Sequence, residues 1–231
     1  MKNFLILWGA TFLLASCTSL SKPQPQSLLD PELTQFTNIY DYGSARMVGD
    51  VLELISTANW FYVTKKTYKN FILEGEVLMP DVQEYSNSGF MFRGRAKVKG
   101  NGFEAEGLQA EIDPSERKWS GGIYHQAGRK WLHPLHPTRS EPDEDFKHNY
   151  LPEWSEEMAN AYKHLQWNKY RIEAIDSDIK VFVNGVLTTH ITDTKHTEGF
   201  IGLQHHGSKK LRESGKTDNL VYFRNIMITE L

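Results

Sequence analysis

The chain has 231 residues, a length that suits one medium-sized domain with short additional segments. Hydrophobic residues make up 39% of it and aromatic residues 12%, which is enough to build a buried core. The formal net charge of −3 gives no sign of a nucleic-acid partner, and the single cysteine excludes a framework of internal disulfides.

The first residues have the form of a secretion signal. Lys2 precedes an apolar run over residues 4–15, and this run is shorter than the about 20 residues that a membrane-spanning helix needs. The run ends in "LASC", which resembles a bacterial lipobox, where the peptide is cut before the cysteine. We therefore expect residues 1–16 to be a lipoprotein signal peptide and Cys17 to be the lipid attachment site. A plain secretory signal with an incidental cysteine is the alternative.

Acyl chains on Cys17 would anchor the protein stably in a membrane. The expected location is the cell envelope, at its periplasmic or outer-membrane face. Residues 17–35 are rich in serine, proline and glutamine and lack apolar periodicity, so they predict a flexible tether. The folded domain is then expected over residues 36–231.

Short runs of alternating polar and apolar residues fill most of this domain. The expected strands lie at residues 46–54, as a hairpin around Gly49-Asp50, and at residues 61–64, 70–79, 88–95, 102–113, 169–174, 180–184, 186–191, 199–205 and 221–230. Strands of this length, with turn signals about every 8–12 residues, predict an all-β sandwich or jelly roll of two antiparallel sheets.

One stretch has a helical pattern. Ser155 can cap a helix over residues 155–164, which begins with glutamates and ends with Lys163 and His164. This short helix follows a long excursion over residues 133–152, which is rich in proline and charge and is expected at the rim of the sandwich. Loops of this length are often functional.

The strand over residues 102–113 ends with three polar side chains on one face. Gln109, Glu111 and Asp113 are two residues apart, so they point the same way, with Cα atoms about 6.6 Å from one to the next. The two carboxyls can approach the separation of about 5–5.5 Å that retaining glycosidases use. Close like charges also raise one pKa, which suits a general acid or base. A solvated outer face of the sheet is the alternative.

Residue types that bind sugars occur near this strand. Arg93 lies on the preceding strand, Trp119 and Tyr124 follow Asp113, and Lys65 and Lys66 end another strand. Sugar hydroxyls take hydrogen bonds from such groups, and the C–H faces of a sugar stack on aromatic rings. Packing of the two aromatic residues in the core is the alternative.

The stretch "EIDPSE", residues 111–116, resembles the catalytic signature of laminarinase-type glycoside hydrolases. That reading requires Glu116 to face the same cleft as Glu111. Pro114-Ser115 should instead turn the chain and send Glu116 elsewhere.

Other sequence signals of chemistry are weak. His133, His136 and the pair His205-His206 lack matching ligands at metal-binding spacing, so no metal site is predicted. The sequence also has no nucleophile elbow and no phosphate loop, and no cofactor is expected.

Several stretches together resemble one family in the order of its motifs. They are "TKKTYKNFILEGEVLM", "NSGFMFRGR", "GLQAEIDPSERKWSGGIY", "WNKYRIEAIDSDIKVFVNG", "GFIGLQHHG" and "VYFRNIMITEL". The family is the 3-keto-disaccharide hydrolase domain, also described as a 3-keto-α-glucoside 1,2-lyase / 3-keto-2-hydroxyglucal hydratase domain. The resemblance covers about residues 36–231, and it implies a concanavalin A-like jelly roll.

The resemblance also implies a reaction. A ketone at C3 of a glucose unit acidifies the hydrogen on C2, a base removes it, and the group on C1 is expelled before water adds. Such an enzyme needs a base, a cation at the C3 oxygen and an acid at the leaving oxygen. The roles that follow as hypotheses are proton transfer by Glu111 or Asp113, stabilisation of the enediolate by Arg93 with Lys65 or Lys66 as rival, hydroxyl binding by Gln109 and His205, and a sugar platform of Trp119 and Tyr124.

The expected partners are an oligosaccharide or glycoside substrate and, through the lipid anchor, a membrane. Three alternatives stay open at this point: a non-catalytic carbohydrate-binding lipoprotein, a laminarinase-type hydrolase and a structural surface lipoprotein. A binding module tolerates neutral residues, whereas an enzyme needs a carboxylate with a perturbed pKa in its cleft.

Overall fold

The computed structural model describes residues 22–81, 86–207, 209–214 and 218–231. The expected signal peptide and the lipid attachment site Cys17 lie outside the described residues. Among the described residues, no helix combines the length and apolar character that crossing a membrane requires.

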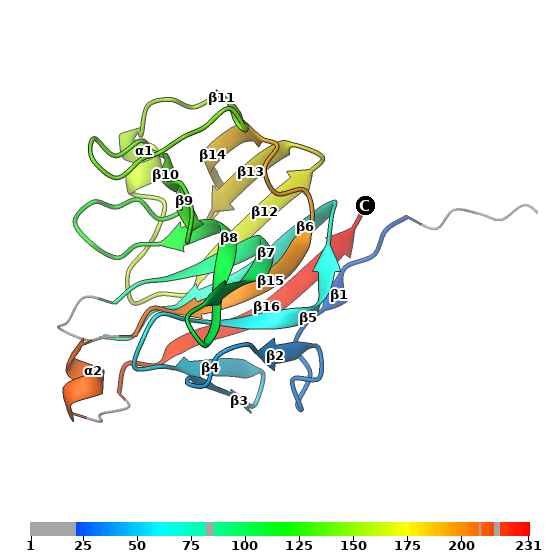
Figure 1. Cartoon of the computed structure of the whole chain (residues 1–231), viewed down its shortest axis with the longest axis vertical. Coiled ribbons are helices and arrows are strands. Elements are labelled where there is room, and N and C mark those ends of the chain that lie inside the picture. The colour runs from blue at the N-terminus through cyan, green and yellow to red at the C-terminus, as the bar shows by residue number, and fades with distance from the viewer. Residues whose placement is uncertain (1–21, 82–85, 208, 215–217) are drawn as a thin grey trace, which may run out of the picture.

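Two antiparallel sheets stack face to face, as the sequence predicts (Figure 1). The nine-stranded sheet runs in the order β11 (Phe146–Asn149), β14 (Val186–Asp193), β13 (Asp178–Val183), β12 (Asn168–Ile175), β6 (Phe71–Leu78), β16 (Val221–Glu230), β4 (Val51–Ile55) and β3 (Ser44–Val48), with β1 (Gln26–Ser27) also paired to β16. The seven-stranded sheet runs in the order β10 (Lys130–His133), β9 (Ile123–Gln126), β8 (Gly102–Ile112), β7 (Ser88–Lys99), β15 (Gly199–His205), β5 (Trp60–Tyr68) and β2 (Phe36–Asn38).

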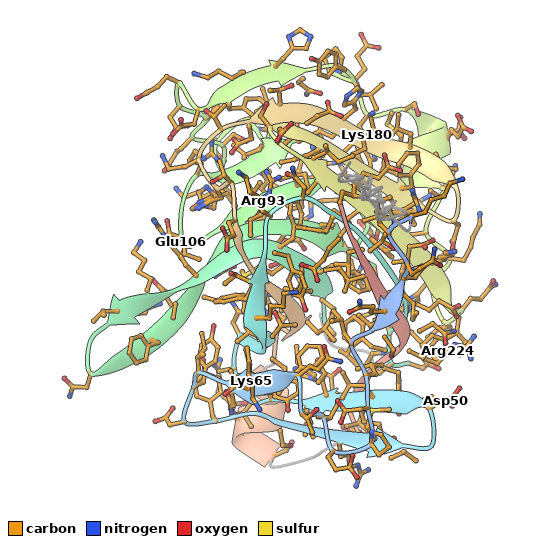
Figure 2. All side chains as sticks on the ribbon, turned by 90° about the vertical axis from the view of Figure 1, so that its right-hand side faces the viewer. Asp50, Lys65, Arg93, Glu106, Lys180 and Arg224 are labelled. Carbon is orange, nitrogen blue, oxygen red and sulfur yellow. The ribbon has the colours of Figure 1, made fainter. Side chains whose placement is uncertain are left out.

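Side chains from both sheets fill the space between them (Figure 2). Phe90 of the seven-stranded sheet packs against Tyr170 and Phe223 of the nine-stranded sheet, with ring centroids 5.3 Å apart in each pair. Because side chains alternate along a strand, the neighbours of the core residues point to the outer face. On β8 the core residues are Leu108, Ala110 and Ile112. Gln109 and Glu111 therefore lie on the outer face.

The expected strands all occur in the structure. β15 and β16 have the expected bounds, whereas β5 and β7 continue to Tyr68 and Lys99. The sequence missed the short strands β1, β2, β9, β10 and β11, which have at most four residues each. Strands this short carry too few alternating positions to be recognised.

The helix expected over residues 155–164 is shorter than predicted. α1 (Glu156–Ala159) has four residues, and the Ser155 side chain caps it by accepting from the Met158 backbone N–H at 3.2 Å. A second short helix, α2 (Lys209–Ser214), was not predicted.

The folded domain begins earlier than the sequence suggests. Residues 26–35 were assigned to the tether, but β1 pairs with β16, and the side chain of Leu28 is only 1% exposed. Leu33 is buried as well. The serines and prolines that surround these two leucines concealed the apolar anchors, and the tether assignment is wrong for this segment.

The contact between the sheets predicts a clear stability difference between two positions of β7. Phe90→Ala removes a fully buried ring and should lower the free energy of unfolding by about 3–5 kcal/mol. Val98→Ala is the matched control on the same strand, because Val98 is 72% exposed, and it should change stability by less than about 0.5 kcal/mol. Urea unfolding followed by tryptophan fluorescence measures both, and equal losses would contradict the assignment of Phe90 to the core.

Candidate active site

A hollow of about 590 Å³ lies on the outer face of the seven-stranded sheet. We call it the Glu111 hollow. Its lining residues are Asn59, Asn87, Glu111, Ser115, Arg117, Tyr124, Gln126, Trp131, Arg139, Gln204 and His206. The register of the sheet builds it, because Trp131 of β10 lies opposite Tyr124 of β9, and Tyr124 lies opposite Gln109 of β8.

Glu111 carries the carboxyl group of this hollow, and its side chain is almost fully buried. The residue is 4% exposed, and its Oε1 atom accepts a hydrogen bond from Gln109 Nε2 at 3.0 Å. Its Oε2 atom has no hydrogen-bond partner among the described residues. Burial, and then the nearby charge of Asp113, raise the pKa of Glu111 well above its ordinary value, while Arg117 and Arg139 act in the opposite direction.

Amide side chains hold the carboxyl in place. Gln109 Nε2 also donates to Gln204 Oε1 at 2.8 Å, and Gln204 Nε2 donates to Asn59 Oδ1 at 2.8 Å. The Gln109 side chain lies over Gly89 of β7, where an added Cβ would come within 2.4 Å of its Nε2 atom. The glycine therefore leaves the room that the Gln109 amide needs to reach Glu111.

Aromatic rings form one wall of the hollow. Trp131 packs edge to face with Tyr124, at 5.4 Å between ring centroids, and with Trp119, at 4.9 Å. The guanidinium of Arg117 lies over the Trp131 ring, 5.3 Å from its centroid. The buried Trp131 Nε1 atom has no hydrogen-bond partner among the described residues.

Two unpartnered polar atoms thus belong to residues that line one hollow. They are the acceptor Oε2 of Glu111 and the donor Nε1 of Trp131. Buried polar atoms are nearly always hydrogen-bonded in folded proteins, so these two atoms retain the capacity to bond a ligand or a water molecule. A hydroxylated ligand can satisfy both.

Two arginines, one after β8 and one after β10, bring positive charge to the hollow. Arg117 and Arg139 both line it. Arg117 Nε donates to Asp113 Oδ2 at 3.0 Å, so Asp113 fixes the direction of this guanidinium. The hollow therefore combines one carboxyl with two guanidinium groups beside an aromatic wall.

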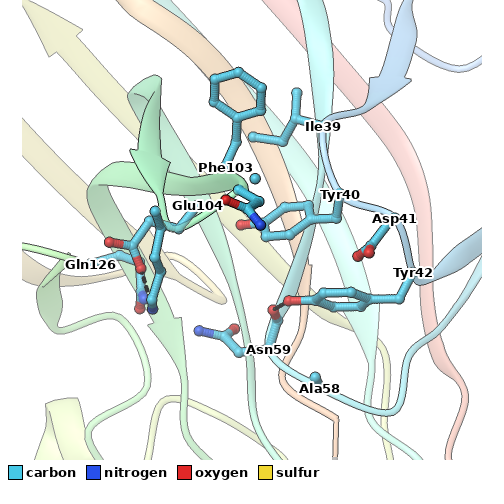
Figure 3. Close-up of a pocket in the computed structure, with 12 residues that line it drawn as sticks. Ile39, Tyr40, Asp41, Tyr42, Ala58, Asn59, Phe103, Glu104 and Gln126 are labelled. Atoms are coloured by element: carbon cyan, nitrogen blue, oxygen red, sulfur yellow. Dashed lines mark hydrogen bonds and ion pairs between the residues drawn. The ribbon is translucent and has the colours of Figure 1, made fainter.

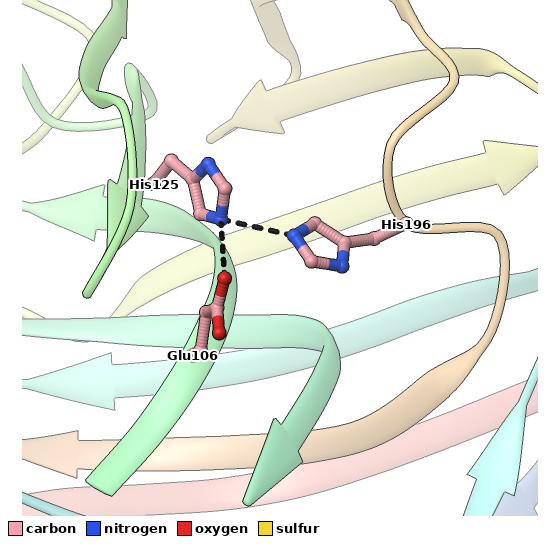
Figure 4. Close-up of side chains that lie close together, drawn as sticks. All are labelled: Glu106, His125 and His196. Carbon is pink, nitrogen blue, oxygen red and sulfur yellow. Dashed lines mark hydrogen bonds and ion pairs between the residues drawn. The ribbon is translucent and has the colours of Figure 1, made fainter. Parts of the chain in front are cut away.

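A second cluster of titratable side chains lies elsewhere in the fold. It consists of Glu106, His125 and His196, all buried, with potential ligand atoms within 4.8 Å of one another (Figure 4). His125 Nε2 lies 2.9 Å from His196 Nε2 and 3.9 Å from Glu106 Oε1.

The hydrogen bonds of His125 decide what this cluster can do. Its Nδ1 atom accepts from the backbone N–H of Arg129 at 3.3 Å and from Arg129 Nε at 2.9 Å. The ring proton of the neutral imidazole is therefore on Nε2, where it is donated toward His196. Burial, followed by the charge of Arg129, lowers the pKa of His125 to about 3. A metal on Nε2 would require both ring nitrogens to lack a proton, so these residues do not fit a metal site.

The chain matches one known protein family over most of its length. The sequence pattern of the 3-keto-alpha-glucoside-1,2-lyase-like domain matches residues 24–229. The chain belongs to this family. The match includes β1, in agreement with the early start of the folded domain. Membership in the 3-keto-alpha-glucoside-1,2-lyase-like family supports a carbohydrate-active function.

Solved structures show that the fold recurs. A candidate glycosyl hydrolase from Parabacteroides distasonis ATCC 8503 is 20% identical, with a TM-score of 0.55, covering 90% of this chain and 100% of that chain. A second one from the same organism is 16% identical, with a TM-score of 0.52, covering 86% and 89%. A Bacillus subtilis protein of unknown function with a galectin-like fold is 10% identical, with a TM-score of 0.50, covering 82% and 87%. No curated protein matches the chain.

The structure brings three of the predicted residues together at the hollow of this family member. Glu111 and Tyr124 line it, and Gln109 supports Glu111 from below. Asp113 does not line it, because its Oδ1 atom accepts from the Ser115 backbone N–H at 3.2 Å while Oδ2 binds Arg117. Asp113 therefore acts on Glu111 through its charge and on the hollow through Arg117.

Arg93 lies away from the hollow, which corrects the prediction. Alternation from the core residues Phe90 and Phe92 would place Arg93 on the outer face. The register of β7 shifts between Phe92 and Arg95, however, and Arg93 has a φ angle of 50°. Its buried guanidinium donates to the backbone carbonyls of His196 and Lys69. Arg93 is also four residues along β7 from Gly89, which pairs with Glu111. Four residues of a strand span about 13 Å between Cα atoms.

Four other predicted binding residues do not line the hollow either. Lys65 Nζ donates to the Thr34 carbonyl at 2.7 Å, and Lys66 forms an ion pair with Glu230. His205 is turned into the fold, where Nδ1 accepts from the Gly207 backbone N–H and Nε2 contacts the Asn219 carbonyl. Trp119 is half-buried and supports Trp131 from behind.

Glu116 is exposed and is not among the residues that line the Glu111 hollow. The chain turns after Asp113, as Pro114-Ser115 predicted. The laminarinase-type arrangement, in which Glu116 and Glu111 face one cleft, is therefore contradicted.

Sequence reasoning missed most of the lining residues. They include Asn59, Arg117, Trp131, Arg139, Gln204 and His206. One signal was available, since Tyr124 and Trp131 lie on either side of residues 127–129, a three-residue connection that contains Gly128 and so indicates a hairpin. Recognition of that hairpin would have placed the two rings opposite each other.

The raised pKa of Glu111 predicts how stability changes with pH. The folded chain holds this proton more tightly than the unfolded chain, so the associated stability is present below the ordinary pKa of 4.5 and is lost as pH rises through the folded-state pKa. Glu111→Gln has no such loss. Its melting temperature should exceed that of the wild type near neutral pH, and the difference should shrink toward pH 4. A difference that is constant over this pH range would contradict the raised pKa.

Proposed function

We propose that this chain cleaves 3-keto-glycosides by removing the proton on C2, expelling the group on C1 and adding water to the product. The observation that carries this proposal is the Glu111 carboxyl. It is buried, it has a raised pKa, and its unpartnered oxygen belongs to a hollow that also holds two guanidinium groups and an aromatic wall.

Glu111 is the proposed base. A ketone at C3 makes the hydrogen on C2 weakly acidic, and the C2 proton passes to Glu111 Oε2. A carboxylate with a raised pKa is a stronger base than an exposed one, which suits proton removal from carbon. Gln109 keeps the carboxyl oriented through its hydrogen bond to Oε1.

Arg117 and Arg139 are the proposed stabilisers of the enediolate. Removal of the C2 proton places negative charge on the C3 oxygen, and guanidinium groups beside it favour that charge. These residues take the role that the sequence had given to Arg93. Asp113 keeps Arg117 in position.

The bond from C1 to oxygen then breaks, and its electron pair goes to the leaving oxygen, which takes a proton. We assign this proton to His206, the imidazole that lines the hollow. Burial lowers the pKa of His206, so its protonated form donates readily. Water adds its hydroxyl to C1 and a proton to C2, and the net result is hydrolysis.

The aromatic wall is the proposed platform for the sugar ring. Tyr124 is half-buried and offers ring surface on which the C–H face of a sugar stacks, and the buried Trp131 supports it edge to face. Gln204 and Asn59 offer amide groups to the hydroxyls. We also propose that the protein acts in the cell envelope, held through Cys17, which the "LASC" sequence supports.

Isotope incorporation tests the reaction. The wild-type chain in D₂O should release 3-keto-glucose with one deuterium at C2 from a 3-keto-glucoside and should leave the unoxidised glucoside intact. Mass spectrometry and NMR measure this, with enzyme-free exchange as the blank. Cleavage without deuterium at C2, or cleavage of the unoxidised sugar, would refute the elimination mechanism.

Two glutamine variants test the base. Glu111→Gln should lower kcat by about 10²–10⁴-fold, because it removes the proton acceptor. Glu116→Gln is the matched control, since Glu116 is exposed outside the hollow, and it should retain wild-type turnover. Retained activity in Glu111→Gln would exclude Glu111 as the base.

The role of Asp113 is tested by its coupling to Arg117. Arg117→Ala should lower kcat by about 10²-fold, and Asp113→Asn should cause a smaller loss. If Asp113 acts by positioning Arg117, the double variant should be no slower than Arg117→Ala alone. Multiplied losses would instead indicate a separate catalytic role for Asp113.

A further inference from the structure

Three hydroxyl side chains of the nine-stranded sheet reach across the core to the backbone around Glu111. Most of the space between the two sheets is filled by apolar side chains. The three hydroxyl residues are Tyr170 of β12 and Thr188 and Thr189 of β14, and each is at most 1% exposed. Burial of a hydroxyl is unfavourable unless the group is hydrogen-bonded, so the partners of these three groups show what they hold.

The Tyr170 hydroxyl binds the backbone of the proposed base directly. It donates to the Glu111 carbonyl oxygen at 3.0 Å. The same oxygen accepts from the Gly121 backbone N–H at 2.8 Å, and the Glu111 N–H donates to the Gly122 carbonyl at 2.9 Å. The regular pairing of β8 with β9 ends one residue before Glu111. These three bonds therefore hold the Glu111 backbone on that side of the strand.

The two threonines hold Gly121, whose N–H donates to the Glu111 carbonyl. Thr189 Oγ1 donates to the Gly121 carbonyl oxygen at 2.7 Å, and Thr188 Oγ1 reaches the same oxygen at 3.0 Å. Adjacent residues of a regular strand point to opposite faces. The register between β13 and β14 shifts at this point, and both threonines are buried. The opposite sheet thus reaches Glu111 both directly and through Gly121.

Gly121 leaves the room that these bonds need. Its φ angle is +86°, in the left-handed region that favours glycine, and an added Cβ would lie 2.2 Å from Thr188 Oγ1. A side chain at this position would displace the threonine hydroxyl. The glycine and the three hydroxyl residues therefore form one unit behind the Glu111 hollow.

We propose that Tyr170 is a positioning residue for the Glu111 carboxyl, which acts from the opposite sheet through the Glu111 backbone. The kinetic part of this inference rests on the proposed function. The carbonyl that Tyr170 holds is bonded to the Glu111 Cα, so fixing it also fixes the direction in which the side chain leaves the strand. A reacting group must be held within about 0.5 Å of its productive place. Gln109 meets this need at the carboxyl, and Tyr170 meets it at the backbone.

Two tyrosine-to-phenylalanine variants test the role of Tyr170 by kinetics. Tyr170→Phe should lower kcat on a 3-keto-glucoside by about fivefold to tenfold and change KM by less than about twofold, because the carboxyl is displaced while the lining of the hollow remains. Tyr40→Phe is the matched control. The Tyr40 hydroxyl also binds the β8 backbone, where it accepts from the Ala105 N–H at 2.9 Å. Tyr40 lines a different hollow, of about 700 Å³, so its variant should retain wild-type kcat and KM (Figure 3).

The titration of Glu111 tests the same inference without turnover. The infrared carboxyl band that disappears in Glu111→Gln reports the protonation of Glu111, and its midpoint pH gives the pKa. Tyr170→Phe should lower this pKa toward its ordinary value by about 0.5 or more, because a looser strand end admits water to the carboxyl. Tyr40→Phe should leave the pKa unchanged. The other titratable groups around Glu111 are the same in both variants, namely Asp113, Arg117, Arg139 and His206.

Thr189 gives a second test that does not require a change at Tyr170. Thr189→Val removes the hydroxyl that holds Gly121, and it should lower kcat and the pKa of Glu111 in the same direction by a smaller amount. Thr189→Ser keeps the hydroxyl and should retain the wild-type values of both quantities. Equal values in the valine and serine variants would contradict the role of this hydroxyl.

The outcomes separate this inference from the proposed function. Equal effects of Tyr170→Phe and Tyr40→Phe, or a lower melting temperature in Tyr170→Phe without a change in kcat or in the pKa of Glu111, would overturn the inference. If cleavage requires Glu111 but not the Tyr170 hydroxyl, the reaction stands and the inference fails. If the wild type does not cleave a 3-keto-glucoside but Tyr170→Phe still lowers the pKa of Glu111, the reaction fails and the positioning role stands.

Discussion

The structure depends on the alternation of side chains along β8. Leu108, Ala110 and Ile112 bind this strand to the core, so Gln109 and Glu111 must point to the outer face. Ser115 and Arg117, which follow β8, and Gln204 of β15 then surround the carboxyl, and the residue is 4% exposed. Burial of Glu111 without a cation on Oε2 disfavours the charged form of the carboxyl. The pKa of Glu111 is therefore raised, and the carboxylate binds a proton more readily.

The surroundings of Glu111 offset only part of the desolvation cost of its charged form. Gln109 supplies one hydrogen bond, while the guanidinium of Arg117 is held by Asp113 and lies over Trp131. A direct ion pair would lower the pKa of Glu111 and occupy its unpartnered oxygen. The arrangement instead keeps the two charges near each other but separately supported, which suits the proton transfer that we propose.

The buried cluster of Glu106, His125 and His196 differs from the Glu111 hollow in how its polar atoms are paired. Glu106, His125 and His196 resemble a metal site by distance alone. Arg129 donates to His125 and also forms ion pairs with Asp143 and Asp193, so the ring nitrogen Nδ1 of His125 is already occupied. A network of this kind joins the loops at one edge of the sandwich. At Glu111, by contrast, the unpartnered Oε2 atom belongs to a residue that lines a hollow.

The sequence by itself determined the two-sheet fold, the bounds of β15 and β16 and the outward direction of Glu111, because these follow from local alternation and turn residues. Only the tertiary structure decided which side chains meet Glu111. A register shift in β7 removed Arg93 from the outer face. Sheet pairing placed Trp131 of β10 and Gln204 of β15 at the hollow, and the turn after β8 placed Arg117 there. The fold and the direction of Glu111 follow from the two-residue period of a strand. The neighbours of Glu111 depend on contacts between segments up to 95 residues apart, such as Gln109 with Gln204, which no local pattern encodes.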